Sequence, residues 1–145
     1  MFFKSVIGQV SALAVGALVA SSLSTTAMAS EQYSEPAPRE VVVSVNDVFV
    51  PGGLKSTDRA FVLLSGLFPN GCYNWDRADV RVHGHHNLIH ITPYAQVNQG
   101  MCIQVLVPFT REVVLGSLSA GTYRVRVSAG DGTYQEKTLN VEGGL

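Results

Sequence analysis

The sequence predicts an all-β sandwich of about seven to eight antiparallel strands, and three observations carry this prediction. Apolar and polar residues alternate through most of the chain beyond residue 40, which is the period of a half-buried strand. Turn residues interrupt the alternation at 51–53 (Pro-Gly-Gly), 69–71 (Pro-Asn-Gly) and 130–132 (Gly-Asp-Gly). No segment keeps an apolar stripe at helical spacing over several turns.

The expected strands follow segment by segment from this alternation. They lie at 41–46, 60–68, 80–83, 89–92, 102–107, 113–115, 123–128 and 134–141. The segment 60–68 is almost continuously apolar, which is typical of a strand with both faces covered. In 123–128, Arg124 and Arg126 alternate with apolar residues, so one face of this strand is expected to be polar and cationic.

The first 29 residues have the three parts of a secretory signal peptide. Lys4 provides a positive start, an uncharged and largely apolar stretch runs from 6 to 23, and 27–29 (Ala-Met-Ala) is a small-x-small cleavage site. We therefore expect cleavage after Ala29. An uncleaved membrane anchor is the alternative, because the apolar stretch is near the lower limit for spanning a bilayer.

Cleavage would leave a mature chain of 116 residues, the size of one domain. Residues 30–39 are polar, contain two prolines and predict a flexible leader, and residues 40–145 are expected to form the sandwich. Without Lys4 the chain has nine basic and eleven acidic residues, a net charge of −2, so no basic excess predicts nucleic-acid binding. The mature protein is expected to be periplasmic or secreted and to have no membrane span.

Cys72 and Cys102 are the two cysteines of the chain. An even number of cysteines in an exported protein predicts a disulfide. Closing a loop of about 30 residues would contribute roughly 3 to 4 kcal/mol in the chain-entropy description. Two buried free thiols are the alternative, and a metal site on these cysteines lacks a second ligand at close spacing.

The segment 118–125 has the pattern Leu-x-x-Gly-x-Tyr-x-Val. In immunoglobulin-like sandwiches, a Tyr at the start of a late strand turns its hydroxyl back onto the backbone of the preceding corner. Tyr123 fits this role, and Gly121 permits the tight turn before it. The sandwich is therefore expected to be immunoglobulin-like. Trp75 is expected in a loop near Cys72, unlike the mid-strand Trp of antibody domains.

A wider resemblance rests on several short segments. They are 48–53 (VFVPGG), 67–73 (LFPNGCY), 107–109 (VPF), 114–116 (VLG) and the corner at 118–125. With these segments the chain resembles small exported immunoglobulin-like β-sandwich proteins of predatory and related proteobacteria, over most of its mature part. The resemblance implies an exported compartment and this fold, and it implies no activity.

All four histidines lie within eight residues of one another: His83, His85, His86 and His90. A hairpin that turns over His85 and His86 would pair Val82 with Ile89 and Val80 with Ile91 on the inner face. On the outer face the same register would place Arg81 opposite His90 and His83 opposite Leu88. His83 and His90 would then be diagonal neighbours.

A turn histidine could add a third nitrogen to His83 and His90, a ligand set that suits Zn²⁺ or Cu²⁺. Arg81 and the lack of a carboxylate in the segment oppose a cation site. A solvated polar strand face is the simpler alternative, and a pH-sensing role is another.

Catalytic patterns are weak. Ser65 lacks the G-x-S-x-G elbow and falls in an expected buried strand. Asp76 and Asp79 flank Arg77 in an expected loop, where a solvated turn explains them. A disulfide would leave no thiol nucleophile. We therefore do not expect an enzyme.

The aromatic residues Tyr73, Trp75, Tyr94 and Phe109 have two interpretations. They could form a recognition surface, because loops at the end of a sandwich often carry binding. Packing around the disulfide is the preferred interpretation.

The sequence thus predicts a non-catalytic module that binds another envelope or extracellular macromolecule of unspecified identity. The alternative function is a periplasmic copper- or zinc-binding protein that uses His83, His85, His86 and His90. A protease inhibitor or an envelope structural component is a third hypothesis.

Overall fold

The alternating segments form strands in the computed structural model, which describes residues 33–144. The described elements are β1 (Arg39–Val42), β2 (Asp47–Phe49), β3 (Leu54–Lys55), β4 (Arg59–Phe68), β5 (Tyr73–His83), the 3-10 turn η1 (Gly84–His86), β6 (Leu88–Val97), β7 (Val107–Ser117), β8 (Gly121–Ser128) and β9 (Tyr134–Glu142). The predicted signal peptide, residues 1–29, lies outside the described residues. No helix within 33–144 has the length and apolarity needed to cross a membrane.

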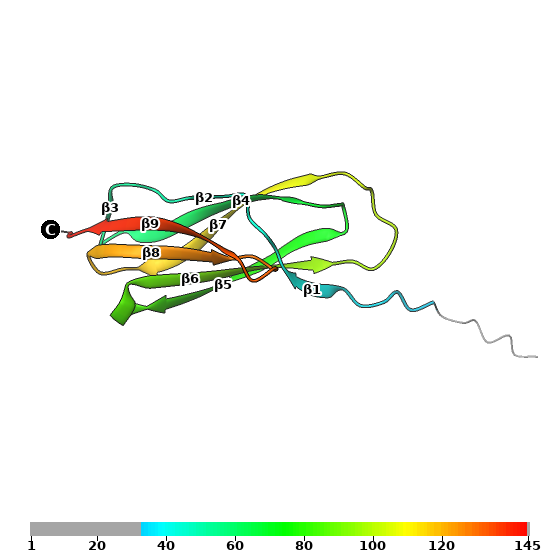
Figure 1. Ribbon diagram of the computed structural model, residues 1–145, viewed down its shortest axis with the longest axis horizontal. Helices are drawn as coiled ribbons and strands as arrows, with labels where there is room; N and C mark the ends of the chain where they lie inside the picture. The colour runs from blue at the N-terminus through cyan, green and yellow to red at the C-terminus, as the bar shows by residue number, and fades with distance from the viewer. Residues whose placement is uncertain (1–32, 145) are drawn as a thin grey trace, which may run out of the picture. The chain divides into compact units, whose positions relative to one another are not determined.

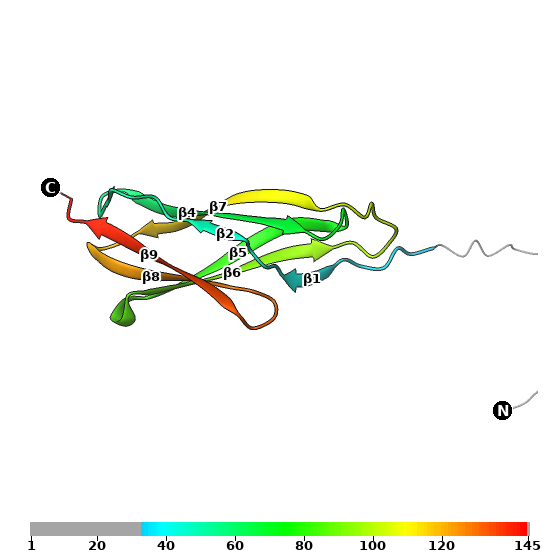
Figure 2. The ribbon, with the colours of Figure 1, turned by 45° about the horizontal axis from the view of Figure 1, so that its top comes forward.

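The strands form two sheets that pack face to face (Figures 1 and 2). Sheet A has six strands in the order β1-β6-β8-β9-β3, with β5 paired to the other side of β6, and sheet B has three strands in the order β2-β4-β7. The most deeply buried side chains come from the inner faces of both sheets: Val62 and Leu64 from β4, Ile89 and Ile91 from β6, Val125 and Val127 from β8, and Leu139 from β9. The predicted β-sandwich is therefore confirmed.

The expectation of purely antiparallel strands is wrong at two pairings. β6 pairs with β8 in parallel, and β3 pairs with β9 in parallel. After β6 the chain crosses to sheet B as β7 and returns to sheet A as β8. Each crossing reverses the direction of the chain, so β6 and β8 run the same way.

The predicted strand at 102–107 is also wrong, because residues 101–106 form a loop. β7 begins only at Val107 and continues through Pro108 to Ser117, which also extends the short strand expected at 113–115. Pro108 is compatible with a strand here because β7 pairs only with β4 and is an edge strand, so no further ladder needs its missing N–H.

Two further expectations are corrected by the structure. Trp75, Asp76 and Asp79 lie in β5, which starts at Tyr73, and not in a loop. The segment 60–68 is a strand, but only its inner face is covered.

The outer face of β4 is half exposed. Phe61, Leu63 and Ser65 are partly accessible, and Leu67 is 47% exposed. Ser65 forms a hydrogen bond with Thr110 on β7 (3.2 Å), which is a structural contact between the two strands.

The predicted tyrosine corner is confirmed. The Tyr123 hydroxyl donates a hydrogen bond to the backbone carbonyl of Ser119 at 2.9 Å, and the ring is only 6% exposed. This bond ties the start of β8 to the β7–β8 connection, which is a crossing between the two sheets.

Replacing Tyr123→Phe should lower the free energy of unfolding by about 1 kcal/mol, because the buried ring is kept and only the hydrogen bond to Ser119 is lost. Urea denaturation followed by fluorescence measures this change. Tyr134→Phe is the matched control, since Tyr134 is 53% exposed. Equal midpoints for the two variants would mean that the corner bond contributes nothing.

Candidate functional site

Two connections cross between the sheets at one end of the sandwich, opposite the η1 turn (Figure 1). Residues 69–72 lead from β4 to β5, and residues 98–106 lead from β6 to β7. The Cys72–Cys102 disulfide joins them, with the two Cα atoms 5.3 Å apart, which confirms the predicted bond. We call this region the disulfide end.

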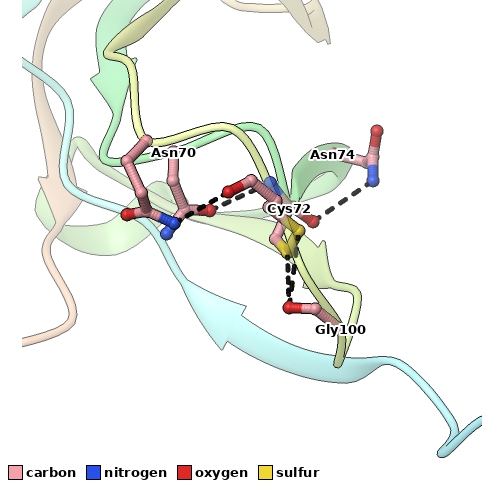
Figure 3. Close-up of a disulfide and its surroundings, with 6 residues drawn as sticks. Asn70, Cys72, Asn74 and Gly100 are labelled. Atoms are coloured by element: carbon pink, nitrogen blue, oxygen red, sulfur yellow. Dashed lines mark hydrogen bonds between the residues drawn. A yellow bond between two sulfur atoms is a disulfide. The ribbon is translucent and has the colours of Figure 1, made fainter.

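Hydrogen bonds around the disulfide fix both connections further (Figure 3). The Gly71 N–H donates to the Ile103 carbonyl at 3.0 Å, and the Asn98 N–H donates to the Cys72 carbonyl at 3.0 Å. The Asn70 side chain accepts a bond from the Cys72 N–H at 2.9 Å. The loops at this end are therefore held by covalent and backbone contacts on both sides of the bridge.

An apolar loop, Met101–Leu106, extends from this fixed base. Its four large apolar side chains are all exposed: Met101 by 104%, Ile103 by 69%, Val105 by 53% and Leu106 by 65%. Single exposed apolar residues are common, but four of them within six residues make this loop the candidate interaction surface of the described residues. Three of these residues, Ile103, Val105 and Leu106, fall in the strand expected at 102–107, so their apolar pattern did not indicate an exposed surface.

Beside the apolar loop is an open pocket of about 450 Å³, which we call the amide pocket. Its polar lining comes from Arg39, Asn70, Tyr73, Asn98, Gln99 and Gln104. Side-chain amides both donate and accept hydrogen bonds, as a polypeptide backbone does. The Gln99 side chain already donates to the carbonyl of Ala37 at 3.0 Å, so one of these amides binds an extended Pro-rich stretch of this chain.

Three of the four singled-out aromatic residues are packing residues, as preferred from the sequence. Phe109 stacks on Phe68 with 4.5 Å between ring centroids, Trp75 lies 5.6 Å from Phe109, and Tyr73 lies 5.8 Å from Phe68. Gly66 makes room for this cluster, because a Cβ atom there would lie 2.6 Å from the Phe109 ring. The fourth, Tyr94, is separate from them and lies under the guanidinium of Arg77 on sheet A.

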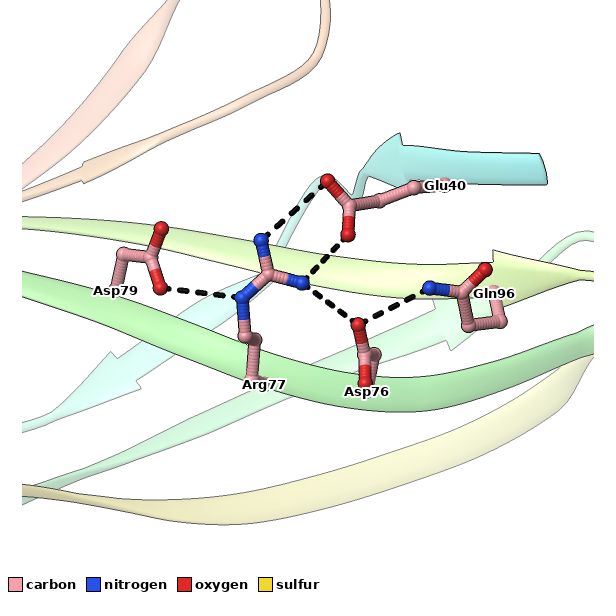
Figure 4. Close-up of polar contacts among 5 residues, drawn as sticks. All are labelled: Glu40, Asp76, Arg77, Asp79 and Gln96. Atoms are coloured by element: carbon pink, nitrogen blue, oxygen red, sulfur yellow. Dashed lines mark hydrogen bonds and ion pairs between the residues drawn. The ribbon is translucent and has the colours of Figure 1, made fainter.

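The two carboxylates considered for catalysis are ion-paired with one arginine (Figure 4). Arg77 contacts Asp76 at 2.7 Å and Asp79 at 3.2 Å, and it also pairs with Glu40 of β1. The hydrogen bond with Glu40 raises the pKa of Arg77 above its usual value, so the guanidinium stays charged. These exposed pairs tie the short strand β1 to β5 across β6 and account for both carboxylates.

The histidine segment forms the predicted hairpin. Arg81 lies opposite His90 and His83 opposite Leu88, as expected, and the turn is η1. His83 and His90 are therefore diagonal neighbours on the outer face of sheet A, while His85 and His86 lie in the exposed turn. The structure thus brings together His83 and His90, from two neighbouring strands, on one face of sheet A.

The surroundings of His90 are unfavourable for a metal cation. Its ring Nε2 is hydrogen-bonded to the hydroxyl of Ser128. Arg81 and Arg126 are its direct neighbours on the two adjacent strands. Among residues 33–144, no group of three or more His, Cys, Asp or Glu side chains is arranged to hold a metal ion.

Isothermal titration should therefore show that Zn²⁺ and Cu²⁺ bind no more tightly to the native protein than to a His83→Ala, His90→Ala variant. The physical reason is repulsion by the two flanking guanidinium groups. Micromolar binding that disappears in the variant would contradict this expectation and restore the metal hypothesis.

Removing the disulfide with Cys72→Ser and Cys102→Ser should lower the free energy of unfolding by roughly 3 to 4 kcal/mol. Without the bridge, the unfolded chain gains conformational entropy. Urea denaturation of oxidised wild type and variant gives the difference. Wild type unfolded without reductant should show no free thiol, and two reactive thiols would refute the bond.

The comparisons with known proteins bear on the fold. The sequence model of the ORF11 beta-sandwich domain matches residues 62–141, more than half of the 145-residue chain and nearly all of β4 to β9. No curated protein and no solved structure matches the chain. On the extent of the family match, the chain belongs to the ORF11 beta-sandwich domain family.

Proposed function

We propose that this protein is an exported, non-catalytic module, periplasmic or secreted, that binds another envelope or extracellular protein through its disulfide end. The observation that carries the proposal is the apolar loop, in which four large apolar side chains are exposed within six residues. The signal-peptide pattern at 1–29 supports export. The disulfide also fits an oxidising compartment.

The loop has the properties of a prepared contact surface. Burying its apolar side chains against a partner would contribute about 25 cal/mol per Å² of apolar area removed from water. Because the disulfide and the Gly71–Ile103 hydrogen bond already fix the loop, little further conformational entropy is lost on binding. In addition, the Ile103 side chain lies directly against Gly71, where a Cβ atom would be 2.7 Å from its Cγ1 atom.

The amide pocket adds polar recognition at the edge of this surface. An apolar centre with a polar rim is the usual composition of a protein–protein interface. Arg39, Asn98 and Gln99 line the pocket with side chains that can bond to backbone carbonyls and amides of a partner. We therefore expect the partner to present a polypeptide segment to the pocket and apolar side chains to the loop.

The groups weighed for catalysis support the non-catalytic part of the proposal. Asp76 and Asp79 are ion-paired with Arg77, and Ser65 is hydrogen-bonded to Thr110. Copper or zinc binding through the histidine segment is not favoured, because Arg81 and Arg126 flank His90.

Photo-crosslinking in the producing cells tests the proposal. With p-benzoylphenylalanine in place of Leu106, irradiation should give a discrete adduct with another protein. Glu112, exposed on the outer face of sheet B, is the matched position and should give none. Adding Met101→Ser and Val105→Ser should reduce the adduct at 106 by about fivefold or more, since both remove apolar contact area.

Val82→Ser is the control substitution, because Val82 is 45% exposed but lies at the opposite end, next to η1; it should leave the adduct unchanged. Three outcomes would overturn the proposal: no adduct at 106, equal adducts at 106 and 112, or an adduct of twice the chain mass. The last would identify a second copy of this chain as the occupant.

A further inference from the structure

We infer a second binding surface, for an acidic polysaccharide, on the outer face of sheet A near the η1 turn. This surface lies away from the disulfide end and does not depend on the protein-binding proposal. We call it the basic face and define it by Arg81, His83, His90, Arg124 and Arg126.

The register of three neighbouring strands aligns these basic side chains. Arg81 on β5 lies opposite His90 on β6, and His90 lies opposite Arg126 on β8. Adjacent strands are about 4.8 Å apart, so this row spans about 10 Å. His83 and Arg124 belong to the next row, on either side of Leu88. Five basic side chains from three strands therefore share one face of sheet A.

Most of this charge is not neutralised by the protein. Arg126 pairs with Glu136 at 2.9 Å. Arg81 and Arg124 are exposed, and no carboxylate within residues 33–144 forms a salt bridge with either. The other end of the same face is different, because there Arg77 is surrounded by three carboxylates.

The charges of sheet A thus differ along the strands: three carboxylates surround Arg77 near β1, whereas near η1 the basic side chains have one paired carboxylate, Glu136. The whole chain has a net charge of −1, so the basic face does not follow from an overall excess of cations. A local excess of this kind attracts anions despite the opposite net charge.

The side chains present suit anionic groups on a sugar. Guanidinium groups bind carboxylate, sulfate or phosphate with two parallel hydrogen bonds. Arg126 is already held in place, with its guanidinium 4.0 Å from the Tyr134 ring centroid and bonded to Glu136. Thr138, in register with Arg124, adds a hydroxyl to the same face, as Ser128 does beside His90.

The shape of the surface favours an extended polymer over a small ligand. The cations stand on an open sheet face and come from three strands, so one small anion cannot contact all of them. The two rows hold no exposed aliphatic side chain for insertion into lipid, since Leu88 in the second row is half buried. An acidic polysaccharide supplies repeated anionic groups together with hydroxyls, which matches the mixture of charged and hydroxyl side chains.

The test is binding of the full, oxidised protein to immobilised heparin, a sulfated polysaccharide, and to polyguluronate, a carboxylated one. Arg81→Ala with Arg124→Ala should weaken binding by about tenfold or more, because each lost guanidinium removes charge-assisted hydrogen bonds. Arg59→Ala with Arg111→Ala is the matched control. It removes the same charge from exposed positions on sheet B and should change the affinity by no more than about twofold.

Arg81→Lys with Arg124→Lys keeps the charge without the planar fork and should recover part of the affinity. Urea midpoints equal to wild type show that each variant is folded, as expected for exposed positions. Equal weakening by the sheet A and sheet B variants would overturn the inference, as would no binding of wild type to either polysaccharide. Tighter binding to duplex DNA or to phosphatidylglycerol vesicles would assign the basic face to another class of partner.

Discussion

The structure depends on the burial of one strand. Val62 and Leu64 of β4 are 0% exposed because they pack against the inner face of sheet A, where Ile89, Val125 and Leu139 are equally inaccessible. Sheet B has only three strands, so β4 alone is covered on both edges. The chain must therefore cross repeatedly between the sheets, and the crossing loops at the ends carry the features that are free to serve binding.

Sequence periodicity predicted the structural features that depend on residues close together in the sequence. The hairpin register from Val80 to Ile91 and the tyrosine corner at Tyr123 are local, and both are present in the structure. The parallel pairing of β6 with β8 was missed, because it depends on a crossing through the other sheet. The apolar residues of 102–107 predicted a strand, but most of this segment is a loop. Alternation along the sequence cannot reveal that the disulfide holds the segment outside the core.

The same limit explains the histidine segment. Their spacing in the sequence places His83 and His90 together and suggests a metal site, because imidazole groups close to one another are common metal ligands. Arg126, which flanks His90, comes from β8 and becomes a neighbour only through the parallel pairing. Once this strand is in place, His90 is flanked by two arginines, which supports the proposed anion-binding surface and opposes a metal cation.

The disulfide determines the conditions under which the apolar loop becomes fixed. Cys72 and Cys102 stay reduced wherever the compartment is reducing, and the bridge that fixes the apolar loop forms only under oxidising conditions. If the chain is exported as proposed, the loop becomes fixed only after it reaches an oxidising compartment. The synthesis of the chain and the fixing of its exposed apolar loop would then be separate in time.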